Sequence, residues 1–178
     1  EKYGYGIELN TPELIMESQG DSKVNSHGTH VAGIAAGSDS FQDGAYVGNA
    51  PDADIVLVAL DLNNCTNADI CNGVKYIFDY AQEVGKPCVI SFSEGSSQSF
   101  DDDERLFEEV LGQIQGPGRI LVASAGNDGS RRTYQHKPRG VERDGVFFLS
   151  QSDRTYFCMA SENQFQICLS AYTSATDR

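Results

Sequence analysis

Between residues 54 and 125, short apolar runs alternate with amphipathic segments, and few folds accommodate that order. Three continuous apolar runs, at 54–60, 88–93 and 120–125, are typical of strands that are covered on both faces. An amphipathic segment separates each run from the next. The order strand, helix, strand, helix, strand predicts right-handed crossover connections and a parallel sheet. The predicted fold class is therefore α/β, with a parallel β-sheet and helices on both of its faces.

Each amphipathic segment has a candidate cap, one apolar face and a terminating signal. Asn67 is a candidate N-cap of the first helix, which Gly85 ends. Asp101 or Asp102 caps the second helix, and the Gly-Pro-Gly turn at 116–118 ends it. The apolar faces consist of Ile70, Val74, Ile77, Phe78, Ala81 and Val84 in the first helix, and of Leu106, Phe107, Val110, Leu111 and Ile114 in the second.

Toward the C-terminus the pattern changes to short apolar runs between polar turns. Runs at 146–149, 155–160 and 164–171 predict an antiparallel β-meander. Three strands with an exposed edge make a weak domain alone, so we expect them to begin a larger inserted β domain. The predicted division is a core over residues 1–145 and a β segment over residues 146–178. Exposed sheet edges also leave open a homo-oligomer in which a second copy fills them.

The composition excludes several classes of partner. The 178 residues include 26 Asp and Glu against 13 Lys and Arg, a net charge of −13, with no basic stripe. A nucleic-acid partner is therefore not expected. No apolar run approaches the roughly 20 residues that cross a bilayer, so a membrane span is not expected either. The first ten residues lack the basic start and apolar core of a secretory signal, which indicates a mature protein or a fragment.

Cysteine usage gives little information on the compartment. The five cysteines contain no CxxC pair, which argues against a zinc cage and against a full disulfide framework. Their odd number leaves at least one thiol free. A bridge between Cys65 and Cys71 and a set of idle thiols are both compatible with the sequence.

The richest run of chemically functional residues begins at Ser26 and continues as His27-Gly28-Thr29-His30-Val31-Ala32-Gly33. Ser26 is a good candidate N-cap, and the small residues after it predict a thin helix that packs closely against its neighbours. His27 then lies at the helix N-terminus, where the macrodipole disfavours an imidazolium. A neutral ring can accept a proton near pH 7, as a general base must, although a histidine at a helix start is also commonly structural.

The heptapeptide from His27 to Gly33 closely resembles the active-site helix of the subtilisin-like serine proteases. Three further segments follow in that family's order. Gly-Asn-Ala-Pro at 48–51 resembles its Gly-Val-Ala-Pro segment, and Val-Ile-Ser-Phe-Ser-Glu-Gly at 89–95 resembles the strand that ends in its substrate-binding Ser-Leu-Gly. Residues 122–129 resemble the strand that ends in the oxyanion asparagine. The resemblance covers about residues 3–129.

The resemblance implies a role for each matching residue. His27 is the expected general base and His30 the structural second histidine. In the family's mechanism the base takes a proton from a serine hydroxyl that attacks a peptide carbonyl, and returns it to the leaving amine. Asn127 is expected to donate its side-chain amide to the oxyanion. The implied substrate-binding residues, where a polypeptide substrate pairs as an added strand, are Ser93, Glu94 and Gly95 on one wall and Ser124, Ala125 and Gly126 on the other.

Glu94 departs from the family pattern, because it stands where the family has an apolar residue. Two interpretations stay open from the sequence. The carboxylate either biases the pocket toward basic or polar substrate side chains, or it points to solvent.

Two members of the catalytic triad have no good candidate. Asp21 lies in a polar loop without the strand context of the family's acid, so a surface role is favoured. Ser174 lies in the sequence Thr-Ser-Ala at 173–175, which partly matches the family's Gly-Thr-Ser-Met-Ala, with Tyr172 in place of the glycine. We therefore expect an internal fragment of a subtilisin-like serine endopeptidase that is inactive by itself. The alternative is a pseudoprotease or a protein-binding module on the same fold.

No cofactor is expected. Asp39 and Asp43 lie in a loop where some family members bind calcium, but two carboxylates are too few for the roughly six or more oxygens that calcium takes. His27 and His30 are three apart without the acid of His-Glu-x-x-His, which argues against zinc. By resemblance the protein is expected to be secreted or in the cell envelope, and the free thiol is a mild argument to the contrary.

Overall fold

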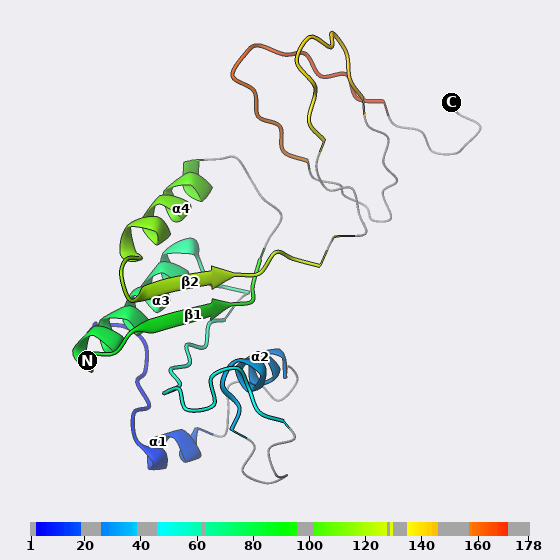
Figure 1. Ribbon diagram of the computed structural model, residues 1–178. Coiled ribbons are helices and arrows are strands. Elements are labelled where there is room, and N and C mark those ends of the chain that lie inside the picture. Colours follow the sequence, from blue (N-terminus) through cyan, green and yellow to red (C-terminus); the bar gives the residue numbers. More distant parts are fainter. Residues whose placement is uncertain are drawn as a thin grey trace. The chain divides into compact units, whose positions relative to one another are not determined.

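The computed structural model describes residues 3–18, 26–38, 46–61, 63–95, 102–127, 129, 135–145 and 157–170. Its elements, labelled in Figure 1, are α1 (Pro12–Glu17), α2 (His27–Ala36), α3 (Asn67–Glu83), β1 (Cys88–Phe92), α4 (Asp102–Ile114) and β2 (Arg119–Ala123). The chain divides into two compact units, Glu1–Glu94 with Val110–Ser124, and Gly95–Glu109 with Ala125–Arg178. Both strands belong to the first unit.

β1 and β2 form a two-stranded parallel sheet, in which Cys88 lies opposite Arg119 and Phe92 opposite Ala123. One further backbone bond continues the ladder, because the Ser124 N–H donates to the Phe92 carbonyl at 3.1 Å. Figure 1 shows the two arrows side by side and pointing the same way, with α4 as the connection between them. The predicted parallel pairing of these strands and the α/β class are confirmed.

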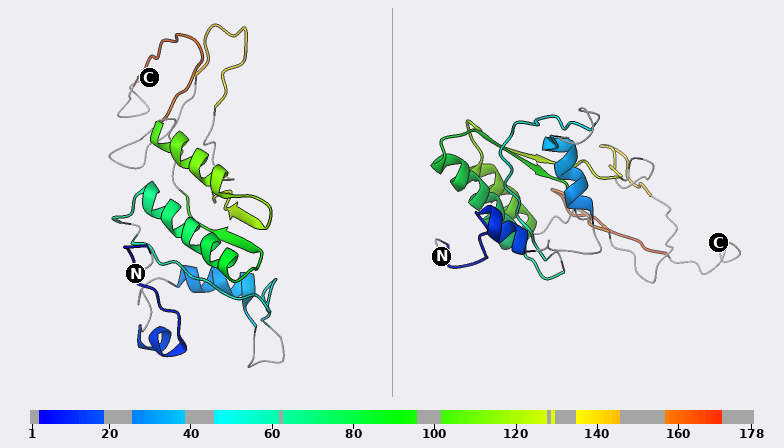
Figure 2. Two further views of the ribbon diagram at one scale, coloured as in Figure 1. Left: turned by 90° about the vertical axis from the view of Figure 1, so that its left-hand side faces the viewer. Right: turned by 90° about the horizontal axis from the view of Figure 1, so that it is seen from below.

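The core lies between one face of this sheet and two helices. Val74 and Phe78 of α3 and Ile90 of β1 form its centre, with Phe78 only 2% exposed. Packed against that centre are Ile77, Cys88, Leu111, Ile114 and Leu121. Figure 2 shows α3 and the end of α4 on the same side of the strands.

The other face of the sheet is exposed. Val89 of β1 and Ile120 and Val122 of β2 alternate with the core residues and are each more than half exposed. The prediction of helices on both faces is therefore not met for this sheet within the described part of the chain. The two helices that contact it share a single face, because Ile90 lies opposite Leu121 and both belong to the same core.

The strand predicted over residues 54–60 is not formed, although the structure describes the whole of that run. Val58 packs instead against α3, where a Cβ added to Gly73 would lie 3.1 Å from its Cγ1. Leu57 remains 74% exposed. An apolar run becomes a strand only where a neighbour satisfies its backbone groups, and the ladder in the described residues joins β1 to β2 alone.

The predicted antiparallel meander is also absent where it can be compared. Residues 157–170 form no strand, and Phe165, Ile167 and Leu169 of its alternating run are all exposed. The run at 146–149 lies outside the described residues. A period-two pattern stabilises a strand only when one face is covered and partner strands are present. The division of the chain at residue 145 stays a prediction.

α3 begins one residue earlier than predicted, with Thr66 and not Asn67 as its N-cap. Thr66 Oγ1 accepts the Asp69 N–H at 3.3 Å, and the Asp69 carboxylate accepts the Thr66 N–H at 2.8 Å. This reciprocal pair is a capping box. The Thr66 hydroxyl and then its N–H stabilise the charged carboxylate, so the pKa of Asp69 lies below its usual value.

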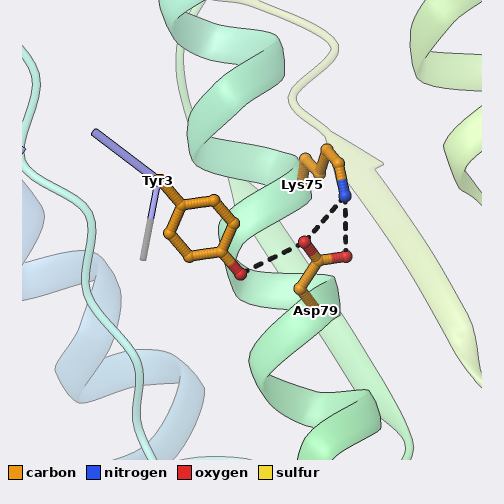
Figure 3. Close-up of polar contacts among 3 residues, drawn as sticks. All are labelled: Tyr3, Lys75 and Asp79. Carbon is orange, nitrogen blue, oxygen red and sulfur yellow. Dashed lines mark hydrogen bonds and ion pairs between the residues drawn. The ribbon is translucent and has the colours of Figure 1, made fainter. Parts of the chain in front are cut away.

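The N-terminal segment is docked onto α3 through polar and aromatic side chains. Tyr3 donates its phenolic hydrogen to Asp79 at 3.1 Å, and Lys75 binds the same carboxylate at 2.7 Å, as Figure 3 shows. The Tyr3 ring lies edge-on to that of Tyr76, with 5.6 Å between centroids. These contacts tie the start of the chain to the helix that forms half of the core.

Candidate active site

His27 is the first residue of α2, as the sequence predicts. Ser26 occupies the N-cap position, but its side chain makes no capping hydrogen bond, contrary to expectation. Its backbone φ of −98° and ψ of 5° differ from the extended geometry that N-cap residues usually adopt. The Ser26 carbonyl starts the helix by accepting the His30 N–H at 3.0 Å. The residues His27 and His30 are both exposed.

The C-terminal end of α2 is held by the segment 48–50, which belongs to the Gly-Asn-Ala-Pro motif. The last carbonyls of a helix have no partners within it, and here three N–H groups of this segment supply them. The bonds run from Gly48 to Gly37 at 2.7 Å, from Asn49 to Ile34 at 3.1 Å and from Ala50 to Ala35 at 2.9 Å. The Asn49 side-chain amide adds a second bond to the Ile34 carbonyl at 3.1 Å. This segment therefore fixes the helix that begins with His27.

Gly48 is required at this junction for steric reasons. A Cβ at this position would lie 2.5 Å from the Gly37 nitrogen, 2.8 Å from the Ala36 nitrogen and 2.9 Å from the Gly33 carbonyl oxygen. All three are backbone atoms, which cannot rotate away as a side chain can. Sequence reasoning matched this glycine to a family segment without finding its role. Its steric role depends on the end of α2, which lies twelve positions earlier in the sequence and meets Gly48 only in the folded chain.

The carboxyl ends of β1 and β2 bring two of the predicted substrate-binding residues into contact. Because the strands are parallel, the residues that follow them leave the sheet at the same edge. The Ser124 hydroxyl donates to the Glu94 carbonyl at 3.2 Å, across 30 residues of sequence. Ser93, which precedes Glu94, is half-buried, and the side chains of Glu94 and Ser124 are exposed.

The remaining predicted site residues belong to the second unit. Gly95, Ala125, Gly126 and Asn127 are all exposed. Gly126 has a φ of 78°, in the left-handed region that glycine tolerates best, and it turns the chain just before Asn127. His27, Ser93, Glu94 and Ser124 lie in the first unit.

Several weaker candidates lie outside the described residues, namely Asp21, Asp39, Asp43 and Ser174. Among the residues that are described, no three or more His, Cys, Asp or Glu side chains are grouped to hold a metal ion. The expectation that the loop with Asp39 and Asp43 is solvated and holds no calcium ion is not tested, because both residues lie outside the described part of the chain. No helix in the described ranges is long and apolar enough to cross a membrane.

The five cysteines are all described and all free, so the bridge between Cys65 and Cys71 is not formed. Burial raises the pKa of the Cys71 thiol and that of Cys88 above the ordinary value. Raised pKa values leave little thiolate at neutral pH, so neither residue is suited to act as a nucleophile.

Comparison with known proteins identifies the family to which the chain belongs. The sequence profile of the Subtilase family (Peptidase S8) matches residues 9–160. The thermophilic serine proteinase of Bacillus sp. (strain AK1) is 37% identical over 114 residues, which cover 63% of this chain and 26% of that protein. The major intracellular serine protease of Bacillus subtilis (strain 168) is 34% identical over 117 residues, covering 63% and 33%. Thermitase of Thermoactinomyces vulgaris is 33% identical over 138 residues, covering 70% and 46%.

The chain thus spans between about a quarter and a half of the length of these relatives. No solved structure matches it. The family profile nevertheless extends across α2, the segment that holds it, both strands and the residues that follow them. Because that match takes in most of the sequence, this chain belongs to the subtilase family of serine peptidases.

Proposed function

We propose that the protein to which this chain belongs is a serine endopeptidase, and that the chain contributes its general base, its oxyanion donor and part of its substrate cleft. The observation that carries the proposal is the position of His27, the first residue of a helix whose far end is held by the 48–50 segment, in a subtilase chain. The serine proteinase and serine protease named among the relatives support the same reaction class.

In the proposed mechanism His27 accepts the proton of a serine hydroxyl as the oxygen attacks a peptide carbonyl. The same ring then donates that proton to the leaving amine, and a second cycle with water releases the acyl group. The Asn127 amide donates a hydrogen bond to the oxygen that becomes negative in the tetrahedral intermediate. Such a donor is effective because it is aimed at charge that exists only near the transition state.

The proposed substrate cleft lies where the chain leaves β1 and β2. Ser93, Glu94 and Gly95 form one wall, and Ser124, Ala125 and Gly126 form the other. Support comes from the bond between Ser124 and the Glu94 carbonyl, which links the two walls at their start. The small side chains let a peptide backbone approach closely enough to pair as an added strand.

We further propose that the nucleophilic serine and the orienting aspartate are supplied from outside this sequence. The isolated chain is then expected to bind peptides without cleaving them. A pure preparation of the 178-residue chain that cleaves casein, and that loses this activity on His27→Ala substitution, would contradict the proposal.

The decisive experiment uses the whole protein and a fluorophosphonate probe that labels activated serines covalently. We expect labelling of one serine and peptide hydrolysis, with turnover reduced about 10⁴-fold or more by His27→Ala. His136→Ala is the matched control, since it removes an exposed histidine that has no part in the mechanism. Absence of both labelling and hydrolysis in the unmodified protein, with peptide binding retained, would assign the chain to a pseudoprotease instead.

We also propose that the protein is secreted or in the cell envelope, and that two copies of the chain can associate. Secretion follows from the resemblance alone, and the relative from Bacillus subtilis is named as an intracellular protease. The exposed sheet face of Val89, Ile120 and Val122 is compatible with association of two copies. Fractionation of the producing cells and sedimentation of the purified chain test these two points.

A further inference from the structure

Glu94 occupies a defined position beyond the carboxyl end of β1. Its carbonyl accepts the Ser124 hydroxyl at 3.2 Å, while the Ser124 N–H donates to Phe92 at 3.1 Å. Ser124 therefore holds the backbone of Glu94 to the continuation of β2. In α/β sheets, ligands bind outside the carboxyl ends of parallel strands. This hydrogen bond holds the Glu94 backbone at the edge where such a ligand arrives, and the side chain of the residue is exposed there.

The carboxylate of Glu94 is exposed, and no side chain in the described residues binds it. Several other acids of the same unit bind side chains or backbone groups within the molecule. Their partners are Lys86 for Asp54, Thr66 for Asp69, Lys75 and Tyr3 for Asp79, and Tyr76 for Glu8. Glu94 differs from these four acids in that its backbone is bound to Ser124 while its carboxylate has no side-chain partner among the described residues.

We propose that Glu94 is a specificity-determining residue that selects a basic side chain, Arg or Lys, of a polypeptide substrate. This inference rests on the proposed function, because it assigns the substrate class of the same cleft. A carboxylate at the cleft edge forms a charge-assisted hydrogen bond with a guanidinium or an ammonium group. Because the Glu94 backbone is already bound to Ser124, only the side chain has to be ordered on binding. The net charge of −13 adds attraction for cationic peptides before they bind.

The test measures kcat/KM of the whole protein on fluorogenic peptides that differ only in the residue before the cleaved bond, with Arg, Gln, Leu or Glu there. Every peptide is N-acetylated, so that the side chain is its only cation. We expect a preference for Arg over Gln of roughly tenfold. Glu94→Gln is expected to bring the ratio of kcat/KM for the Arg peptide to that for the Gln peptide close to one. Added salt is expected to lower this ratio in the unmodified protein.

Two substitutions serve as controls for charge and for folding. Glu17→Gln removes an exposed carboxylate at the end of α1 and is expected to leave the ratio unchanged. Glu94→Asp keeps the charge on a shorter side chain and is expected to retain part of the preference. Thermal unfolding of each variant confirms that the compared proteins are folded.

A ratio near one in the unmodified protein, or a preference that survives Glu94→Gln, overturns the proposal. Cleavage that requires a free α-amine also overturns it, because the carboxylate would then bind a peptide terminus. If no peptide is cleaved and no serine is labelled, the proposed function has failed, and a second measurement still decides the role of Glu94. In that case, binding of the acetylated Arg and Gln peptides to the 178-residue chain is compared by fluorescence anisotropy, and equal affinities overturn the proposal.

Discussion

The phenol of Tyr76 donates a hydrogen bond to the carboxylate of Glu8 at 2.6 Å, across 68 residues of sequence. The contact lies beside the bond from Tyr3 to Asp79, so the N-terminal segment meets α3 at two points. The hydrogen bond to Glu8, then partial burial, and then the negative charge of Glu8 favour the protonated phenol and raise the pKa of Tyr76 to about 12. The contact between the N-terminal segment and α3 therefore depends on Tyr76 being protonated.

Tyr76→Phe removes this hydrogen bond while it keeps the ring. We expect the free energy of unfolding to fall by about 1 kcal/mol, the usual contribution of a hydrogen bond of this kind. Urea denaturation at neutral pH measures the change. Tyr80→Phe is the matched control on the exposed side of the same helix. Equal effects of the two substitutions would show that the bond to Glu8 contributes nothing.

The raised pKa of Tyr76 predicts a loss of stability in alkali. In the unfolded chain the phenol ionises near its ordinary pKa of 10.0, and in the folded chain near 12. Its contribution is fully present below about pH 10 and is lost as the pH rises toward 12. We expect the difference in unfolding free energy between the unmodified chain and Tyr76→Phe to shrink over that interval. A difference that stays constant from about pH 9 to pH 12 would contradict the assignment.

The capping box of α3 predicts different effects for substitutions at Thr66 and at Asn67, the residue that follows it. Thr66→Ala is expected to lower the free energy of unfolding by about 1 kcal/mol, because the Asp69 N–H loses its acceptor. Asn67→Ala removes the first helical residue's side chain and is expected to have little effect. Denaturant unfolding of both variants compares them directly. The reverse ranking would support the cap that the sequence predicts at Asn67.

Two glycine substitutions are expected to act in opposite directions. Gly48→Ala places a Cβ against backbone atoms at the end of α2 and is expected to cost about 1 to 3 kcal/mol of stability. Gly112→Ala lies in the exposed interior of α4 with no atom within 4 Å of the added Cβ, and is expected to gain up to about 1 kcal/mol. Thermal unfolding of both variants tests the pair. A neutral Gly48→Ala would show that the 48–50 segment does not hold α2 tightly.

The elements that the sequence predicts correctly are those specified by local pattern. α3 and α4 each combine a repeating apolar face with a glycine that ends the helix, and β1 and β2 are short apolar runs next to those helices. α1 was missed although its signals were present. Thr11 caps it by accepting the Leu14 N–H, and Pro12 occupies its first position.

The incorrect strand predictions share one cause. The run at 54–60 and the alternating run at 164–171 have the apolar pattern of strands, but a strand also needs a partner, and a partner is a long-range property. For the same reason the sequence predicts where His27 and Glu94 occur without predicting what holds them. The bonds from the 48–50 segment to α2, and from Ser124 to Glu94, join residues that only the folded chain brings together.

The parallel register of the sheet determines the order in which the chain can fold. Cys88 and Arg119 are opposite each other although they are 31 positions apart, and every other pair in the ladder has the same separation. Contact between β1 and β2 forms only when a loop that contains all of α4 has closed, and the entropy of that closure is lost before the pairing compensates for it. The hydrogen bonds of α3 and α4 join residues close in sequence, so helix formation has a much smaller closure cost than this pairing. During synthesis β1 leaves the ribosome 31 residues before β2, so over that interval the backbone groups of β1 lack the partner that the folded chain gives them.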